Sequence, residues 1–322
     1  MGISALRLFA ANLSFDETSQ LKGIVDRNMI ETAFKWVHKK PTEKTCEVLG
    51  ITSSSSGKNF PTVGGVLLFG SNRLILFPDA LIRCARFKGV TKEEIIDQKD
   101  IGVGLPFVIH ETINFIERNT RIEGKIGRIL RKDIAEYPPL AVREAVINAL
   151  LHADYSMKGC HTQIAIFDDR IEFTNPGGLP FGQTLQKALA GFSRLRNRVV
   201  GRVFRELNLI EQWGSGLQKI LTACKKRGLK QPKIEELNNQ FRLTIFSILE
   251  EETKTKLQAW EEVLLLYLQQ TKSITTKDAA KLWKVTDRTA RSRLKIMAKE
   301  GAIQRIGTSE KDPRAIFILR GG

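Results

Sequence analysis

The residues REAVINALLHADYS, Arg143–Ser156, carry apolar side chains at the spacing of an α-helix, and a pair of prolines stands shortly before them, as at a helix start. Glu144, Asn148 and His152 follow one another at intervals of four residues, so they share one face of that helix. The pattern predicts a helix with a carboxylate, an amide and an imidazole in one polar stripe. An ordinary solvated helix face has the same spacing, so the motifs that follow decide between the two interpretations.

Two strand patterns and a glycine turn come after this helix. Thr162–Asp168, TQIAIFD, alternates as a strand, and Ile171–Thr174 continues as a second strand after a tight turn. The second strand runs into Asn175–Pro180, NPGGLP, which on its own indicates only a turn. Further on, Trp213–Leu217, WGSGL, opens an amphipathic helix. Glycines just before a helix let backbone N–H groups approach an anion at the helix N-terminus.

The order of these motifs resembles the GHKL-type ATP-binding fold of gyrase, the heat-shock chaperones, histidine kinases and MutL. The sequence is most similar to a divergent branch of bacterial and archaeal proteins called "transcriptional regulator" or "RecG-like helicase-related". The phrases that carry this resemblance are PTVGGVLLFGSNRLILFPDALIRCARFKG, EAVINALLHADYS, DDRIEFTNPGGLP and EQWGSGLQKI. Together they span nearly all of the chain, and their combination is more specific than any one of them.

The resemblance implies that the predicted helix at Arg143–Ser156 binds ATP with Mg²⁺. Asn148 stands where the family holds Mg²⁺ against the phosphates, and an amide oxygen suits this hard cation. Glu144 stands where gyrase-like ATPases place the base that orients the attacking water, with His152 or Arg143 as its candidate partner. Glu144 is therefore the expected catalytic residue, and His152 is expected to line the cofactor site.

The glycine turns complete the implied cofactor site. Asn175 replaces the aspartate that usually accepts a hydrogen bond from the adenine amino group, and an amide oxygen accepts that bond more weakly. Arg196 lies in the implied lid, where it either meets phosphates or is merely exposed. The remaining expected cofactor contacts are glycines and a serine, namely Gly177, Gly178, Gly214, Ser215 and Gly216. The usual D-x-G-x-G pattern is broken here, so slow or absent hydrolysis is consistent with the sequence.

The net charge of +16 and the isoelectric point near 9.8 indicate a polyanionic partner, most often nucleic acid, although a basic surface can also serve solubility alone. Four scattered cysteines without a C-x-x-C pair indicate a reducing compartment and neither a disulfide framework nor a zinc site. No apolar run reaches membrane-spanning length, and the N-terminus has no signal-peptide pattern. We expect a cytoplasmic protein that does not associate with membranes.

These patterns predict an α+β protein with a two-layer α/β sandwich of the Bergerat type. We expect a helical segment at 1–60, the ATP-binding domain at 61–248, a linker at 249–257 and a winged helix-turn-helix domain at 258–322. Inside the first two regions we expect helices at Asp16–Lys40 and Ile101–Arg118, a loop at Ser53–Ser56, an extended segment at Gly124–Leu130, and strands at Val63–Phe69, Leu74–Phe77 and Leu81–Phe87. Relatives usually carry an Alba-like domain before a segment such as LRLFAANLSFDE, so the resemblance implies that this domain is missing.

The C-terminal region has the element order of a winged helix. Helices are expected at Trp260–Gln269, Thr276–Trp283 and Asp287–Lys299, followed by a hairpin of Ile303–Ile306 and Ala315–Leu319. The third helix and the wing supply the residues expected to bind double-stranded DNA: Arg288, Arg291, Ser292, Arg293, Lys295, Lys311 and Arg314. Such domains usually bind paired half-sites, so we also expect a homodimer. A winged helix can instead dock proteins, and the basic charge favours DNA.

Three functions are compatible with the sequence. The first is a DNA-binding transcriptional regulator with a domain that binds ATP, with or without slow hydrolysis. The second is a DNA-binding regulator whose nucleotide fold has become a scaffold or a sensor of another ligand. The third is an ATP-dependent enzyme acting on DNA, which fares worst because the sequence has no G-x-x-x-x-G-K-[ST] loop. The presence of both Glu144 and Asn148 favours the first function over the second.

Overall fold

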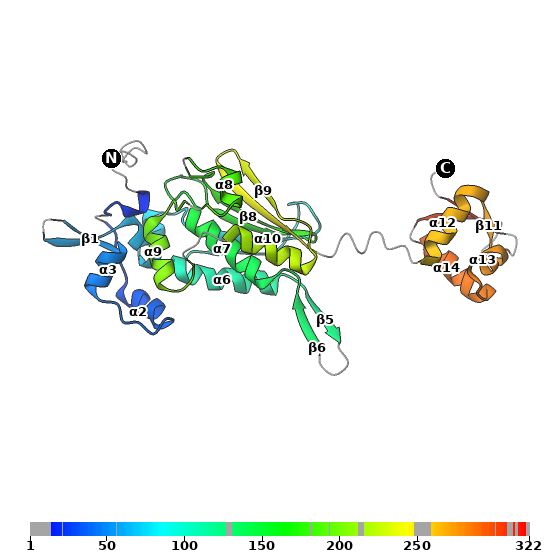
Figure 1. Cartoon of the computed structure of the whole chain (residues 1–322), viewed down its shortest axis with the longest axis horizontal. Coiled ribbons are helices and arrows are strands. Elements are labelled where there is room, and N and C mark those ends of the chain that lie inside the picture. Colours follow the sequence, from blue (N-terminus) through cyan, green and yellow to red (C-terminus); the bar gives the residue numbers. More distant parts are fainter. Residues whose placement is uncertain are drawn as a thin grey trace. The chain divides into compact units, whose positions relative to one another are not determined.

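The computed structural model divides the chain into two compact units, Met1–Glu250 and Glu251–Gly322, which are described separately (Figure 1). The residues that the structure describes are 14–20, 22–55, 57–126, 131–180, 182–192, 194–211, 216–247, 259–299, 301–307, 312 and 315–319. The expected linker and the segment LRLFAANL lie outside them. Among the described residues, none of the helices combines the length and apolar character that crossing a membrane requires.

A mixed sheet forms the centre of the first unit. In the described part of the chain it has six strands in the order β4-β3-β7-β8-β10-β9. Strands β3 and β7 are parallel, and the other neighbours are antiparallel. The strand bounds are Ile82–Phe87 for β3, Ile95–Ile101 for β4, Thr162–Ile166 for β7, Arg170–Pro176 for β8, Lys233–Leu237 for β9 and Gln240–Phe246 for β10. The predicted strands at β3, β7 and β8 are confirmed, whereas β4 and β9 were not predicted.

Three helices cover one face of this sheet: α6 (Leu105–Arg118), α7 (Pro139–His152) and α10 (Gly216–Arg227) (Figure 1). Helix α7, predicted from REAVINALLHADYS, lies between α6 and α10 and contacts β8. Most of its residues are buried, because it packs against neighbouring helices as well as against the sheet. Helix α6 begins at Leu105 and not at Ile101, since the residues before it belong to β4 or its loop.

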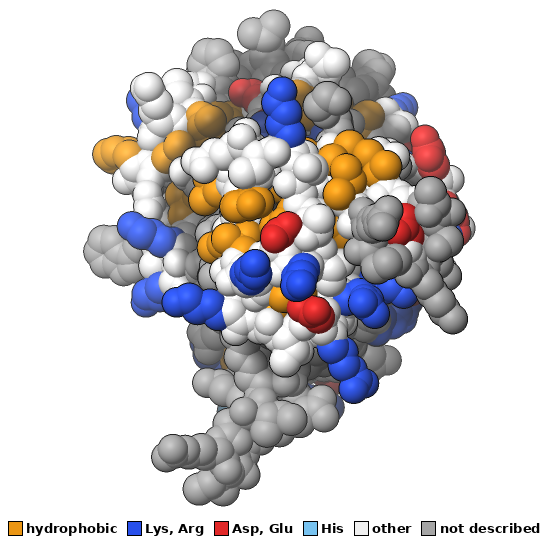
Figure 2. Space-filling model, turned by 90° about the vertical axis from the view of Figure 1, so that its right-hand side faces the viewer, with side chains coloured by type: hydrophobic (Ala, Val, Ile, Leu, Met, Phe, Trp, Pro, Cys, Tyr) orange, Lys and Arg blue, Asp and Glu red, His pale blue; other side chains and the backbone are white. Residues whose placement is uncertain are grey.

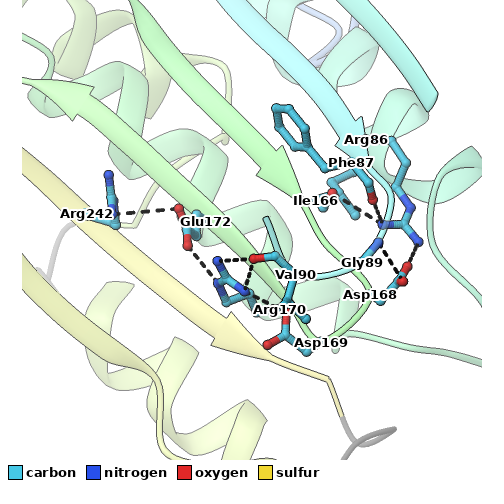
Figure 3. A network of polar contacts seen from close by, with 10 residues as sticks. All are labelled: Arg86, Phe87, Gly89, Val90, Ile166, Asp168, Asp169, Arg170, Glu172 and Arg242. Carbon is cyan, nitrogen blue, oxygen red and sulfur yellow. Dashed lines mark hydrogen bonds and ion pairs between the residues drawn. The ribbon is translucent and has the colours of Figure 1, made fainter. Parts of the chain in front are cut away.

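The opposite face of the sheet carries paired charges (Figure 3). In β8, alternate residues reach this face, and Arg170 donates to Glu172 at 2.7 Å while Arg242 of β10 lies 3.8 Å from the same carboxylate. At the end of β7, Asp168 pairs with Arg86 and accepts a hydrogen bond from the Gly89 N–H. Arg170 and Arg242 on this face are therefore engaged with a carboxylate of the same sheet, whereas Arg86 is in register with Ile166 of the helix-covered face. The helix-covered face is the apolar one.

The predictions for residues 16–61 were partly wrong. In place of one helix over Asp16–Lys40 there is a short 3-10 turn, η1, followed by α2, and the loop expected at Ser53–Ser56 lies largely in a hairpin. The elements of this region are η1 (Phe15–Glu17), α2 (Arg27–Lys35), α3 (Glu43–Leu49), β1 (Thr52–Ser55) and β2 (Lys58–Pro61). Their apolar residues, such as Phe34 and Leu49, share the core of the sheet and its helices.

The apolar run Val63–Phe69 is a helix, α4, and not the predicted strand. All of its residues are buried, and a short apolar run buried on every side has no periodicity that separates helix from strand. The Thr62 hydroxyl accepts a hydrogen bond from the Gly65 N–H at 2.9 Å and caps the helix. A Cβ at Gly65 would lie 2.0 Å from the Ile51 carbonyl oxygen, so this helix depends on a glycine at its contact with the preceding chain.

Two neighbouring predictions also change. Leu74–Phe77 was predicted as a strand, but α5 (Arg73–Leu76) is helical. The extended segment expected at Gly124–Leu130 belongs in part to a hairpin of β5 (Ile122–Ile126) and β6 (Arg131–Ala135), which projects from the body of the unit in Figure 1. Residues 127–130 lie outside the described part of the chain.

A buried carboxylate joins the N-terminal region to α9 (Arg198–Glu206). The Asp16 side chain is fully buried and accepts hydrogen bonds from three consecutive N–H groups at the start of α9: Arg198 at 3.0 Å, Val199 at 2.7 Å and Val200 at 3.0 Å. These are the unpaired donors of a helix N-terminus. Burial raises the pKa of Asp16. The contact spans more than 180 residues of sequence, so local patterns contain no sign of it.

The second unit has its own apolar core, which includes Leu264, Leu294 and Phe317. The predicted helices and hairpin occur there, together with a short strand, β11, that was not predicted. The elements are α12 (Ala259–Thr271), β11 (Ile274–Thr275), α13 (Thr276–Trp283), α14 (Asp287–Lys299), β12 (Ile303–Ile306) and β13 (Ile316–Leu319), with the three strands in the order β11-β13-β12.

Candidate functional site

A cavity of about 280 Å³ opens in the first unit beside α7, α10 and the ends of β8 and β10. Apolar side chains form one part of its wall, among them Phe173 and Phe241. Six of the residues singled out in the sequence line it: Glu144, Asn148, His152, Asn175, Gly178 and Gly216. These residues come from three distant stretches of the chain, and the fold brings them to one place.

The polar stripe of α7 lies along the wall of this cavity. Glu144 is 8 % exposed, and the Arg143 guanidinium lies 3.3 Å from its carboxylate while donating to the Leu209 carbonyl at 2.8 Å. Burial raises the pKa of the Glu144 carboxyl, and the positive charges of Lys219 and Arg143 oppose that shift. A carboxylate with a raised pKa and a fixed cationic neighbour has the properties of a general base.

The N-terminus of α10 packs closely against the stripe of α7. A Cβ at Gly216 would lie 3.0 Å from the Asn148 amide nitrogen and 3.2 Å from a Glu144 carboxylate oxygen, so a larger residue would crowd both groups. Gly216 is the first residue of α10, where unpaired N–H groups favour an anion. The expected phosphate contacts Gly214 and Ser215 lie outside the described residues.

Asn175 is 3 % exposed, lies on β8 and is paired in the sheet with Phe241 of β10. The first glycine that follows is required by its backbone conformation, and the second lies close to a side-chain carboxylate. Gly177 has φ of +85°, a conformation that side chains disfavour, and its N–H donates to the Asn239 carbonyl at 2.7 Å. A Cβ at Gly178 would lie 2.0 Å from the Glu236 carboxylate. The turn therefore keeps its shape around Asn175 by backbone geometry, and Gly177 itself does not line the cavity.

Arg196 lies beside the cavity and not in its wall. Its guanidinium donates to the His152 carbonyl at 3.0 Å and the Gly178 carbonyl at 2.6 Å, and it pairs with Asp154 at 3.1 Å. Its polar groups thus tie the end of α7 to the glycine turn. The position favours a structural role over the phosphate contact that the resemblance implied.

Several residues of the cavity wall were not among the expected site residues. They are charged or aromatic: Arg194, Arg205, Glu211, Lys219, Phe192 and Phe241. Lys219 forms an ion pair with Glu211 at 2.7 Å. The spacing of three residues from Gly216 on the same helix was a signal that could have identified Lys219, because residues three apart share a helix face.

His152 is half-buried at the end of the stripe, and its buried Nδ1 has no hydrogen-bond partner among the residues that the structure describes. Burial, followed by the charge of Arg196, lowers the pKa of His152 to about 4. The imidazole is therefore neutral at pH 7. His152 therefore lines the cavity with an uncharged ring.

This pKa predicts a pH-dependent stability. The unfolded chain takes up a proton near pH 6.5 while folded His152 takes it up only near pH 4, so stability is lost as pH falls through that window. The slope is at most about 1.4 kcal/mol per pH unit for this one group. His152→Gln should reduce the dependence of the free energy of unfolding on pH, which urea denaturation at pH 7, 6 and 5 measures. His38→Gln, at an exposed position, should keep the wild-type slope, and an unchanged slope in His152→Gln would contradict the assignment.

A second candidate surface lies on α14. Arg288, Arg291, Ser292 and Lys295 are exposed there, as expected of a DNA-reading helix. Arg293 is different, because its guanidinium lies 4.8 Å from the ring centre of Trp260 and 5.5 Å from that of Trp283. This arrangement places Arg293 in the packing of the unit. The expected wing residues Lys311 and Arg314 lie outside the described part of the chain.

Residues 159–245 match a family model described as "Putative ATP-dependent DNA helicase recG C-terminal". This segment is therefore similar to an ATPase-like, RecG-related domain. It contains β7 to β10, both glycine motifs and α10, while α7 precedes it.

The chain is also similar in structure to the DIP2311 protein from Corynebacterium diphtheriae, with a TM-score of 0.61 and 20 % sequence identity. The match covers 96 % of this chain and 65 % of that protein, so this chain spans less than two thirds of the length of DIP2311. At this identity the likeness concerns the fold alone. None of the curated proteins matches the sequence significantly.

Proposed function

We propose that this protein is a DNA-binding transcriptional regulator whose first unit binds ATP together with Mg²⁺ in the cavity beside α7. The observation that carries the proposal is the meeting of Glu144, Asn148, Asn175 and Gly216 on one cavity. The ATPase-like match over residues 159–245 supports it, as does the resemblance to the GHKL group and its Bergerat fold.

Each of these residues has a distinct role in the proposal. The apolar wall and the Asn175 amide receive the adenine ring and its amino group. The start of α10, at Gly216, receives the phosphates. Glu144 acts as the base that orients a water molecule for hydrolysis. The cavity volume of about 280 Å³ is close to the lower end of small-molecule sites, of about 300 Å³, and suits the nucleoside part.

The donor set fits Mg²⁺ in a particular way. No group of three His, Cys, Asp or Glu side chains in the described part of the chain can hold a metal ion. In the proposal Asn148 would supply one oxygen ligand, and phosphate oxygens and water would supply the others, which is the coordination that Mg²⁺ favours in nucleotide sites. Bound there, Mg²⁺ would neutralise phosphate charge.

The residue at position 175 supports a second candidate function, in which the first unit does not use ATP. Asn175 replaces the acidic adenine contact of the superfamily, which would suit a scaffold or a sensor of another ligand. An ATP-driven helicase motor has less support, since the sequence contains no G-x-x-x-x-G-K-[ST] loop.

For the second unit we propose a winged helix that binds double-stranded DNA through α14, as a homodimer on paired half-sites. The exposed Arg288 and Arg291 are three residues apart on one face of that helix. The net charge of +16 supports an anionic partner, and Figure 2 shows one face of the molecule on which Lys and Arg side chains lie beside hydrophobic ones.

Thermal melting with ATP and Mg²⁺ tests the nucleotide proposal. A ligand at about 100 times its dissociation constant should stabilise the first unit by about 2.7 kcal/mol. Asn148→Ala should lose the part of this stabilisation that depends on Mg²⁺. Asn28→Ala, at an exposed position on α2, is the matched control and should behave as wild type. No change in melting or in calorimetric heat at millimolar ATP and Mg²⁺ would refute the proposal.

A further inference from the structure

Lys219 stands in the part of the cavity where the phosphates are proposed to lie. It lines the cavity three residues after Gly216 in the first turns of α10, and Gly216 packs against both Asn148 and Glu144. Its side chain is 25 % exposed, and its charge acts on the Glu144 carboxyl. The ammonium group is thus a partly desolvated cation beside the proposed catalytic carboxylate.

The partner of Lys219 is itself part of the cavity wall. The Glu211 side chain is 67 % exposed, and its carboxylate oxygen forms an ion pair with the Lys219 ammonium nitrogen at 2.7 Å. An ion pair with so exposed a partner contributes little stability, about 0–1 kcal/mol, so Lys219 can leave it at small cost. A phosphate group offers more charge and more acceptor oxygens than one carboxylate. Exchange of the carboxylate for a phosphate is therefore favourable when a phosphate lies within reach.

We propose that Lys219 binds the terminal phosphate group of a bound nucleoside triphosphate, and that Glu211 holds Lys219 when that phosphate group is absent. The inference rests on the proposed nucleotide site and adds to it a preference for triphosphate over diphosphate. In this proposal Glu211 and the terminal phosphate group compete for Lys219. The cavity distinguishes ATP from ADP because only ATP offers a phosphate group that displaces the Glu211 carboxylate from Lys219.

Other cations near the cavity are less suited to this role. Arg143 contacts Glu144 but does not line the cavity, and its guanidinium is held by the Leu209 carbonyl. Arg194 and Arg205 also line the cavity, and Lys219 is the lining cation whose positive charge acts on the Glu144 carboxyl. Lys219 is therefore the cation placed to touch the last phosphate next to the residue that would orient water.

Calorimetric titration with ATP and with ADP, each with Mg²⁺, tests the inference. We expect the wild type to bind ATP more tightly than ADP by about tenfold or more, since charge-assisted hydrogen bonds are the stronger ones. Lys219→Met keeps most of the side-chain length and removes the charge, so it should bring the ratio of the two dissociation constants close to one with ADP affinity retained. Lys226→Met, exposed on the same helix and outside the cavity wall, should keep the wild-type ratio.

Glu211→Gln gives an opposite and independent readout. Removing the competing carboxylate should strengthen ATP binding severalfold and leave ADP binding unchanged. In the double variant with Lys219→Met most of this gain should vanish, because the proposal has Glu211 affect ATP binding mainly by holding Lys219. An unchanged ATP-to-ADP ratio in Lys219→Met, or an equal loss for both nucleotides, would overturn the inference alone. A wild type that binds neither nucleotide would overturn the proposed function and the inference with it.

Discussion

Replacing Glu144 by Gln is expected to lower ATP turnover by about 100-fold to 10,000-fold, the usual contribution of a general base, while ATP affinity stays near that of the wild type. Gln has the size and hydrogen-bonding reach of Glu but cannot accept the proton of the attacking water. The Glu144 carboxylate lines the cavity one helical turn before Asn148, and Arg143 lies 3.3 Å from it. Because burial raises the pKa of Glu144, wild-type turnover should fall on the acid side as this group becomes protonated.

Phosphate release under single-turnover and steady-state conditions measures this effect. Glu117→Gln, on the exposed side of α6, removes the same charge elsewhere and should turn over ATP as the wild type does. Equal turnover in Glu144→Gln and wild type would remove Glu144 from the mechanism. A wild type that binds ATP without releasing phosphate would restrict the cavity to nucleotide binding.

Removing both Arg288 and Arg291 should weaken binding to duplex DNA by about 30-fold or more, since each base-contacting arginine contributes about 1–3 kcal/mol. Both side chains are exposed on α14, whereas Ala290 and Leu294 of the same helix are buried in the core of the second unit. The cationic side of α14 therefore faces away from that core. If one of the two contacts phosphate instead of a base, the loss should be alike for all sequences, and the salt dependence should flatten by about one unit per contact.

Fluorescence anisotropy across a salt series measures the DNA effect for the double alanine variant. Lys35→Ala combined with Lys40→Ala removes two exposed charges from the first unit and controls for net charge. Arg293→Ala provides a second comparison, because loss of its contacts with Trp260 and Trp283 should affect the stability of the second unit more than its contacts with DNA. Unchanged affinity in a folded Arg288→Ala/Arg291→Ala variant would assign the unit to protein docking.

Long patterned elements were predictable, and short buried ones were not. Helix α7 and strands β7 and β8 were predicted from the spacing of their apolar residues and from the turn residues near their ends. Helix α4 was predicted as a strand because VGGVLLF is apolar throughout, and its helical form depends on the Thr62 cap and on the close contact of Gly65 with Ile51. Strand β4 was missed because one of its edges is unpaired and most of its residues are at least partly exposed, so its sequence is polar.

For the candidate site, the sequence by itself determined the residue types and their local spacing. It placed Glu144, Asn148 and His152 in one stripe on one helix, and it placed glycines where the backbone adopts conformations that other residues disfavour. Local spacing has this power because helix and turn geometry depend on residues close in the chain. Tertiary structure alone decided which of these groups meet and which are already engaged. It brought Lys219 and Glu211 to the cavity and directed Arg196 to backbone carbonyls. Such contacts join residues tens of positions apart, and their energies depend on burial and on partners that no local pattern specifies.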